Sequence, residues 1–123
     1  MSKKIFTVLS LLIVASMLLS ACDLFKGKPS EADCATEEVF CVGLVTDVGE
    51  VDDKSFNQSS WAGVQLAETE LDAIINYVET KDAKDYAANM QLFIDKGYDV
   101  IVTVGFALGT ATTEAATANP DVL

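Results

Sequence analysis

The sequence contains no histidine and no arginine. The first absence removes the side chain that most often serves as a general base near neutral pH, and the second removes the bidentate phosphate clamp. No nucleophile elbow or phosphate loop is present, and Gly105 to Gly109 does not match a dinucleotide fingerprint. Acidic residues outnumber basic ones, giving a formal net charge of −11 that repels nucleic acid. We therefore expect neither an enzyme, nor a cofactor, nor a nucleic-acid partner.

The N-terminus carries the most informative pattern. Lys3 and Lys4 precede an uncharged stretch that ends in Leu19-Ser20-Ala21-Cys22. A basic start, an apolar middle and small residues before a cleavage point are typical of a secretory signal peptide. The cysteine after the small residues resembles a bacterial lipobox. We therefore predict a signal peptide at residues 1–21, lipidation of Cys22, and a lipid-anchored protein on the outer side of the cell membrane. A plain signal peptide or a short membrane anchor remains open, because the run is near the roughly 17 residues that a spanning helix needs.

Polar residues with Lys26, Gly27, Lys28, Pro29 and Ser30 follow, so we predict a flexible tether over residues 22–38. Cys34 and Cys41 lie in the exported part of the chain, where an oxidising compartment makes a disulfide between them reasonable. Two free thiols, or pairing with a cysteine elsewhere, remain alternatives. The spacing matches no metal motif, so no metal site is expected.

Strands and helices alternate through the rest of the chain. Apolar runs at 39–45, 73–79 and 98–104 predict buried strands, each followed by a helical pattern. This order predicts an α/β fold with a parallel sheet covered by helices on both faces. Three strands make a small sheet, and the sequence stops where a fourth strand is expected. We therefore interpret residues 39–123 as an incomplete N-terminal lobe of a longer protein.

Helix ends have their own signals. Ser55 and Gln58 have the spacing of a capping box at the start of the first helix, and Asp82 is placed to cap the second. Gly97 stands where a left-handed helix terminator belongs, and Pro120 ends the third helix. Asp52 and Asp53 are interpreted as a solvated loop.

Candidate binding residues follow the first and third strands, because ligands of open parallel sheets bind beyond the carboxyl ends of the strands. Asp47 offers two acceptor oxygens to hydroxyl donors, Asn57 offers a donor and an acceptor, and Phe56 can stack on a planar base. The helix start also supplies unpaired N–H groups. Gly105 and Phe106 follow the third strand. Alternatively, Asp47 is a cap or turn residue, Phe56 packs on its own helix, and Gly105-Phe106 is a turn with a core aromatic.

Two segments resemble the basic membrane protein (BMP) family of PnrA-like substrate-binding lipoproteins. The first is Val42-Gly-Leu-Val-Thr-Asp-Val-Gly-Glu-Val-Asp-Asp-Lys-Ser-Phe-Asn-Gln-Ser-Ser-Trp-Ala-Gly63, and the second is Gly97-Tyr-Asp-Val-Ile-Val-Thr-Val-Gly-Phe106. Asn119-Pro-Asp121 is also similar to the family. Glu50 departs from it, since glycine is common at that position.

The resemblance implies the N-terminal lobe of a two-lobe, type I periplasmic-binding-protein-like fold that encloses its ligand between the lobes. It also implies an ABC transporter permease as partner and a purine nucleoside as ligand. Asp47 would bind the ribose, Phe56 would stack on the base, Asn57 would add polar contacts, and Gly105 and Phe106 would line the cleft. The alternative function is a surface or signalling lipoprotein that contacts a protein partner instead of a nucleoside.

Overall fold

The computed structural model describes residues 27–123. The signal peptide predicted at 1–21 and the lipidation site Cys22 lie outside the described residues. Within residues 27–123, six main elements follow one another: β1 (Cys41–Val48), α2 (Phe56–Leu71), β2 (Ile74–Thr80), α3 (Tyr86–Asp95), β3 (Val100–Val104) and α4 (Gly109–Ala118). Three 3₁₀ turns accompany them: η2 (Glu31–Asp33), η3 (Ala83–Asp85) and η4 (Phe106–Leu108).

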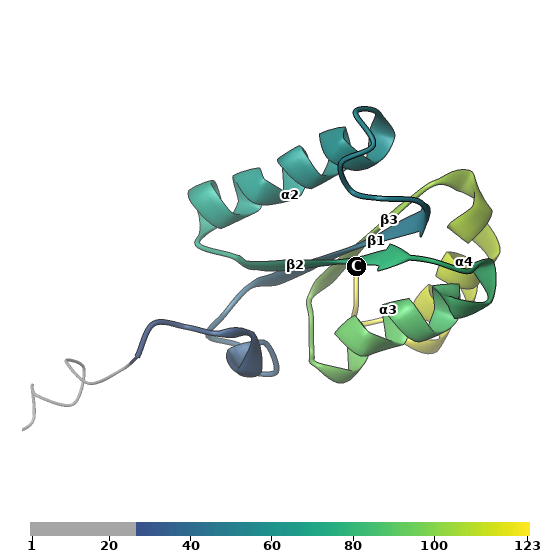
Figure 1. Cartoon of the computed structure of the whole chain (residues 1–123). Coiled ribbons are helices and arrows are strands. Elements are labelled where there is room, and N and C mark those ends of the chain that lie inside the picture. Colours follow the sequence, from purple (N-terminus) through teal and green to yellow (C-terminus); the bar gives the residue numbers. More distant parts are fainter. Residues whose placement is uncertain (1–26) are drawn as a thin grey trace, which may run out of the picture.

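The three strands form a parallel sheet in the order β2-β1-β3. Val42 of the central strand pairs with Ile75 on one side and with Val100 on the other. Helix α2 covers one face of the sheet, and α3 and α4 cover the other (Figure 1). The predicted class, a parallel α/β sheet with helices on both faces, is confirmed. Strand β1 runs three residues further than predicted, to Val48, because it gains partners on both sides.

Alternate side chains of β1 enter two separate cores. Val42 and Leu44 pack on the α2 side, together with Val64 of α2. Cys41 and Val45 pack on the opposite side, in a core completed by Tyr86, Met90, Phe93, Tyr98 and Leu108. Gly43 leaves room for the Phe93 ring, since a Cβ there would lie 2.7 Å from that ring. A sheet covered on both faces needs such an apolar central strand.

The helix signals had mixed outcomes. Asp82 accepts the Lys84 N–H at 3.0 Å and so caps the 3₁₀ turn η3 that leads into α3, not α3 itself, whose N-cap position is Asp85. Gly97 adopts a left-handed conformation with φ of 76° just after α3, as predicted. Helix α4 ends at Ala118, two residues before Pro120, as predicted. Helix α2 buries Val64 toward the sheet, whereas Leu71 at its last turn is 61% exposed.

The segment before β1 packs against the domain from Glu31 onward, in contrast to the flexible tether predicted to extend to residue 38. Glu31 Oε1 accepts hydrogen bonds from Asn76 (3.1 Å), Lys96 (2.9 Å) and the Tyr98 hydroxyl (2.8 Å). Lys96 first, then Tyr98 and Asn76, hold the pKa of Glu31 below its usual value. Burial, together with the Glu31 carboxylate, raises the pKa of Tyr98. The sequence did not reveal this anchor, because all three of its partners are distant in the chain.

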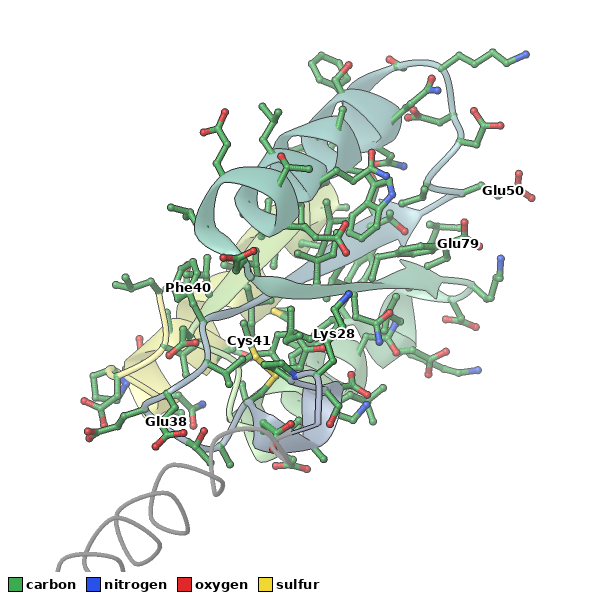
Figure 2. All side chains as sticks on the ribbon, turned by 90° about the vertical axis from the view of Figure 1, so that its left-hand side faces the viewer. Lys28, Glu38, Phe40, Cys41, Glu50 and Glu79 are labelled. Carbon is green, nitrogen blue, oxygen red and sulfur yellow. A yellow bond between two sulfur atoms is a disulfide. The ribbon has the colours of Figure 1, made fainter. Side chains whose placement is uncertain are left out.

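A disulfide closes the same segment. The Cys34 and Cys41 sulfurs are 2.00 Å apart, and both side chains are buried in the core under α3. Figure 2 shows this disulfide next to Cys41. The disulfide and the Glu31 contacts thus attach the segment before β1 to the amino edge of the sheet.

Candidate ligand-binding site

Asp47 and Gly105 meet at the carboxyl edge of the sheet. Thr46 pairs with Val104, so the residues after these two lie side by side. Gly105 has a φ of 114°, and a Cβ at this position would overlap the Asp47 carboxylate and lie 2.8 Å from the Asp47 Cβ. Only glycine adopts this conformation readily, and only glycine leaves space for the Asp47 side chain. The structure thus brings together two residues that are distant in the sequence.

The end of β1 carries an irregularity that affects Asp47. Val45 pairs with Val78, whereas Val48 pairs with Thr80, so β1 contains one residue more than β2 in this interval. Bulges of this kind change the direction of a side chain and occur frequently near binding sites. Asp47 is half-buried as a result, while the preceding Thr46 is fully buried.

Phe56 and Phe106 are exposed at the same edge. Phe56 is the first residue of α2 and is 81% exposed, and Phe106 is the first residue of η4 and is 100% exposed. Neither ring is covered in the way that a helix staple or a core aromatic would require. Large exposed aromatic side chains after the ends of β1 and β3 are a feature that often marks a binding surface.

Asn57 lies at the start of α2, and its side chain is bonded within the fold. Its side chain is buried, with 6% exposed, and its Nδ2 donates to the Glu50 carbonyl at 3.1 Å. The amide therefore holds the loop between β1 and α2. Glu50 itself is exposed, so this loop accommodates its side chain without burying a charge.

The cap of α2 is Asp53 and not Ser55, whose side chain makes no capping bond. The Asp53 carboxylate accepts N–H bonds from Ser55 (2.8 Å), Asn57 (3.2 Å) and Gln58 (3.1 Å). Desolvation raises the pKa of Asp53, but these donors outweigh it and hold the pKa below its usual value. A carboxylate suits a helix start better than a hydroxyl does, because the positive end of the helix dipole favours an anion. Asp53 is thus not simply solvated, and these helix-start N–H groups are occupied.

Several residues that support the site were missed in the sequence. Thr46 Oγ1 donates to the Gly49 carbonyl at 3.0 Å and accepts the Thr80 N–H at 3.2 Å. Asn89 Nδ2 donates to Thr80 Oγ1 at 2.9 Å. The one available signal was Thr46, a polar residue in an otherwise apolar strand, since a buried hydroxyl needs partners.

Trp61 lies half-buried on α2, packed against the core on that face of the sheet, with its ring 4.9 Å from that of Tyr77. Within residues 27–123, no helix is long and apolar enough to cross a membrane. The same part of the chain contains no group of three or more acidic, cysteine or histidine side chains arranged to hold a metal ion.

Comparison with known proteins places these features in a family. Residues 40–123 match the family model described as ABC transporter substrate-binding protein, PnrA-like. A solved structure of an ABC transporter solute-binding protein from Aeropyrum pernix superposes with a TM-score of 0.61 and 25% identity. The match covers 68% of this chain and 23% of that one.

Two curated relatives match nearly the whole chain. The "CD4+ T-cell-stimulating antigen" of Listeria innocua is 33% identical over 127 residues, and the "ABC transporter nucleoside-binding protein BmpA" of Lactococcus lactis is 29% identical over 124 residues. Each match covers 98% of this chain and 35% of the relative, so the chain spans about a third of the length of these proteins. The chain thus belongs to the PnrA-like family of ABC transporter substrate-binding proteins and corresponds to its N-terminal portion.

Proposed function

We propose that this chain is the N-terminal lobe of a lipid-anchored solute-binding protein that delivers purine nucleosides to an ABC transporter permease. The observation that carries the proposal is the carboxyl edge of the sheet, where Phe56 and Phe106 are exposed beside the half-buried Asp47. A second lobe would close over this edge and enclose the ligand. The permease and the small ligand follow from membership of the family.

The chemistry of the edge suits a nucleoside. An exposed phenylalanine ring stacks on a purine base, and this contact tolerates different bases because each has a π face. A carboxylate accepts hydrogen bonds from two neighbouring hydroxyl groups, as a ribose diol presents them. The Lactococcus lactis relative is named as nucleoside-binding, which supports the same ligand class.

Substitution of Asp47 distinguishes the contribution of the ribose to binding from that of the base. We expect Asp47→Ala to weaken guanosine binding roughly ten- to a hundred-fold, because hydrogen bonds to charged groups contribute about 1.5–3 kcal/mol. Guanine, which has no diol, should bind with nearly unchanged affinity. Isothermal titration of the whole gene product with both compounds measures the difference. Asp52→Ala, an exposed aspartate of the same loop, is the control. An equal loss for guanosine and guanine would contradict the ribose role.

We propose the lipid anchor at Cys22 on the sequence pattern alone. Two or three acyl chains hold a protein stably on a membrane, since each buried methylene contributes about 0.8 kcal/mol. Cells expressing the wild-type protein should incorporate labelled palmitate into it and retain it in the membrane fraction, whereas Cys22→Ala should do neither. Unchanged labelling of the variant would contradict the anchor.

The alternative is a surface lipoprotein whose exposed phenylalanines contact a protein partner. The name of the Listeria innocua relative describes an antigen, which keeps this class open for the family. The two functions differ in one result, because only the first predicts that the purified protein binds a nucleoside without any other protein.

A further inference from the structure

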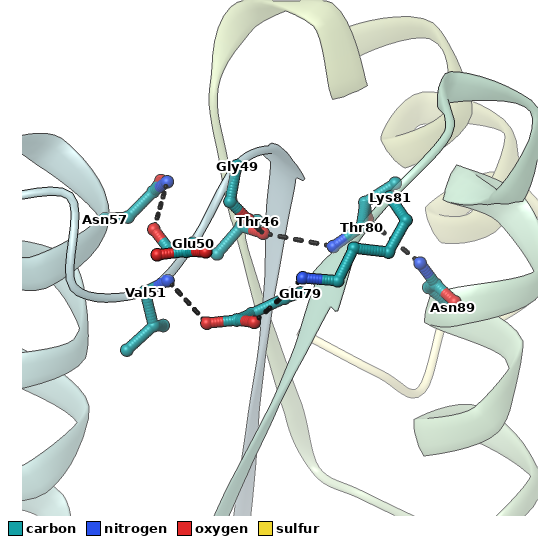
Figure 3. Close-up of polar contacts among 9 residues, drawn as sticks. All are labelled: Thr46, Gly49, Glu50, Val51, Asn57, Glu79, Thr80, Lys81 and Asn89. Carbon is teal, nitrogen blue, oxygen red and sulfur yellow. Dashed lines mark hydrogen bonds and ion pairs between the residues drawn. The ribbon is translucent and has the colours of Figure 1, made fainter.

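The loop between β1 and α2 is held by side chains from three different elements (Figure 3). Gly49, Glu50 and Val51 are consecutive, and each has one backbone group bonded to such a side chain. Thr46 of β1 donates to the Gly49 carbonyl at 3.0 Å, and Asn57 of α2 donates to the Glu50 carbonyl at 3.1 Å. The Val51 N–H donates to Glu79 Oε1 of β2 at 2.8 Å.

Glu79 supplies the charged contact among the three. Its second oxygen, Oε2, accepts a hydrogen bond from Lys81 Nζ at 3.2 Å. The Val51 N–H first, and Lys81 second, hold the pKa of Glu79 below its usual value, so the carboxylate stays ionised at neutral pH. Hydrogen bonds to an ionised acceptor are stronger than neutral ones. The Glu79 contact is therefore a firm attachment between the edge strand and the loop.

The end of β2, from which the Glu79 side chain extends, is itself held by hydrogen bonds. Thr80, next to Glu79, donates its N–H to Thr46 Oγ1 at 3.2 Å, and its hydroxyl accepts from Asn89 of α3 at 2.9 Å. The Gly49 N–H donates to the Thr80 carbonyl at 3.3 Å. The end of β2 is thus bonded to both β1 and α3, which fixes the backbone from which the Glu79 side chain extends.

The held loop joins the two residues on which the proposed site depends. It begins after Asp47 and ends at Phe56, and a Cβ on Gly49 would lie 3.9 Å from Asp47 Oδ1 and 3.5 Å from Asn57 Nδ2. A displacement of Gly49 to Val51 would therefore change the surroundings of Asp47 and the start of α2 together. Glu79 makes no bond to Asp47 or Phe56 and acts on them through Val51.

We propose that Glu79 is a positioning residue for ligand binding, which holds the loop of residues 49–55 so that Asp47 and Phe56 contact the same ligand. This proposal rests on the proposed function, and it adds Glu79 of the edge strand β2 to the residues on which ligand binding depends. Without the Glu79 carboxylate the loop spends part of its time in other conformations. The apparent affinity then falls in proportion to the fraction that remains competent.

The test uses three variants of the whole gene product and two measurements. Glu79→Ala removes the acceptor, Glu79→Gln keeps an amide oxygen that can accept the Val51 N–H, and Glu114→Ala removes an exposed carboxylate of α4 as the control. Amide hydrogen exchange of peptides covering residues 49–55 reports the loop without ligand. Guanosine titration reports the site.

We expect Glu79→Ala to raise exchange at Val51 and to weaken guanosine binding, both by about ten-fold, with Glu79→Gln restoring much of each and Glu114→Ala changing neither. The proposal is overturned if exchange stays at the wild-type level in Glu79→Ala. It is equally overturned if the loop loosens while guanosine binds as before. If the wild-type protein binds no nucleoside, the proposed function itself is wrong. That result differs from one in which the wild-type protein binds guanosine and Glu79→Ala binds it equally well, which overturns only the role of Glu79.

Discussion

Replacement of Phe56 by alanine should weaken purine nucleoside binding roughly ten- to a hundred-fold, because stacking of a base on an aromatic ring contributes about 1–3 kcal/mol. The same change should leave the free energy of unfolding almost unaltered, since the ring is 81% exposed and fills no space in the core. Isothermal titration with guanosine and inosine, together with urea denaturation, measures both quantities on the whole gene product. A large loss of affinity without a loss of stability would identify Phe56 as a ligand contact.

Phe40→Ala is the matched control for this prediction. Phe40 precedes β1 at the amino edge, opposite the proposed site, and is 39% exposed. Its removal should leave the affinity for nucleosides at the wild-type level. If Phe56→Ala binds guanosine as tightly as the wild type, the ring has no stacking role, and Phe56 belongs to another kind of surface.

Gly105→Ala should disrupt both stability and binding. The residue has a φ of 114°, where a side chain stores strain on the order of 1–3 kcal/mol. The new Cβ would also overlap the Asp47 carboxylate and displace it. We expect a stability loss of about 2 kcal/mol or more and a loss of nucleoside binding at least as large as that of Asp47→Ala.

Gly109→Ala is a control of the same chemical type. Gly109 has a helical φ of −52°, and no atom lies within 4 Å of its Cβ position, so alanine should be neutral or stabilise by about 0.4–1 kcal/mol. A double variant, Gly105→Ala with Asp47→Ala, removes the overlap with the carboxylate but retains the backbone strain and the 2.8 Å approach of the two Cβ atoms. It should be more stable than the sum of the two single changes predicts. Simple additivity would show that Gly105 and Asp47 do not interact.

The sequence alone was sufficient to predict the class of fold. Three short apolar runs separated by helical patterns predicted β1, β2 and β3, and the parallel order followed from the alternation of the elements. Errors concentrated at the ends of elements, where local propensity competes with pairing. Strand β1 continues through Thr46 and Asp47 although both are polar, because neighbours on two sides extend the ladder and the Thr46 hydroxyl has partners in the fold.

The sequence predicted at which edge of the sheet the candidate site residues lie, but it did not predict which residues they contact. Asp47 and Gly105 were assigned to one crevice from the order of the strands, whereas their direct packing depends on the bulge in β1 and on the φ of Gly105. Asn57 was assigned to the ligand but is bonded to the Glu50 carbonyl. Asp53, Glu31 and Glu79 gave no signal, because an acidic residue in a polar stretch has the same pattern whether it is solvated or bonded.

A crystal structure of the whole gene product with guanosine would show directly whether a purine nucleoside lies at the carboxyl edge of the sheet. We expect the purine ring to stack on Phe56 and the ribose hydroxyls to lie within hydrogen-bond distance of the Asp47 carboxylate. A nucleoside found elsewhere, or a protein that stays empty at saturating guanosine, would contradict this expectation.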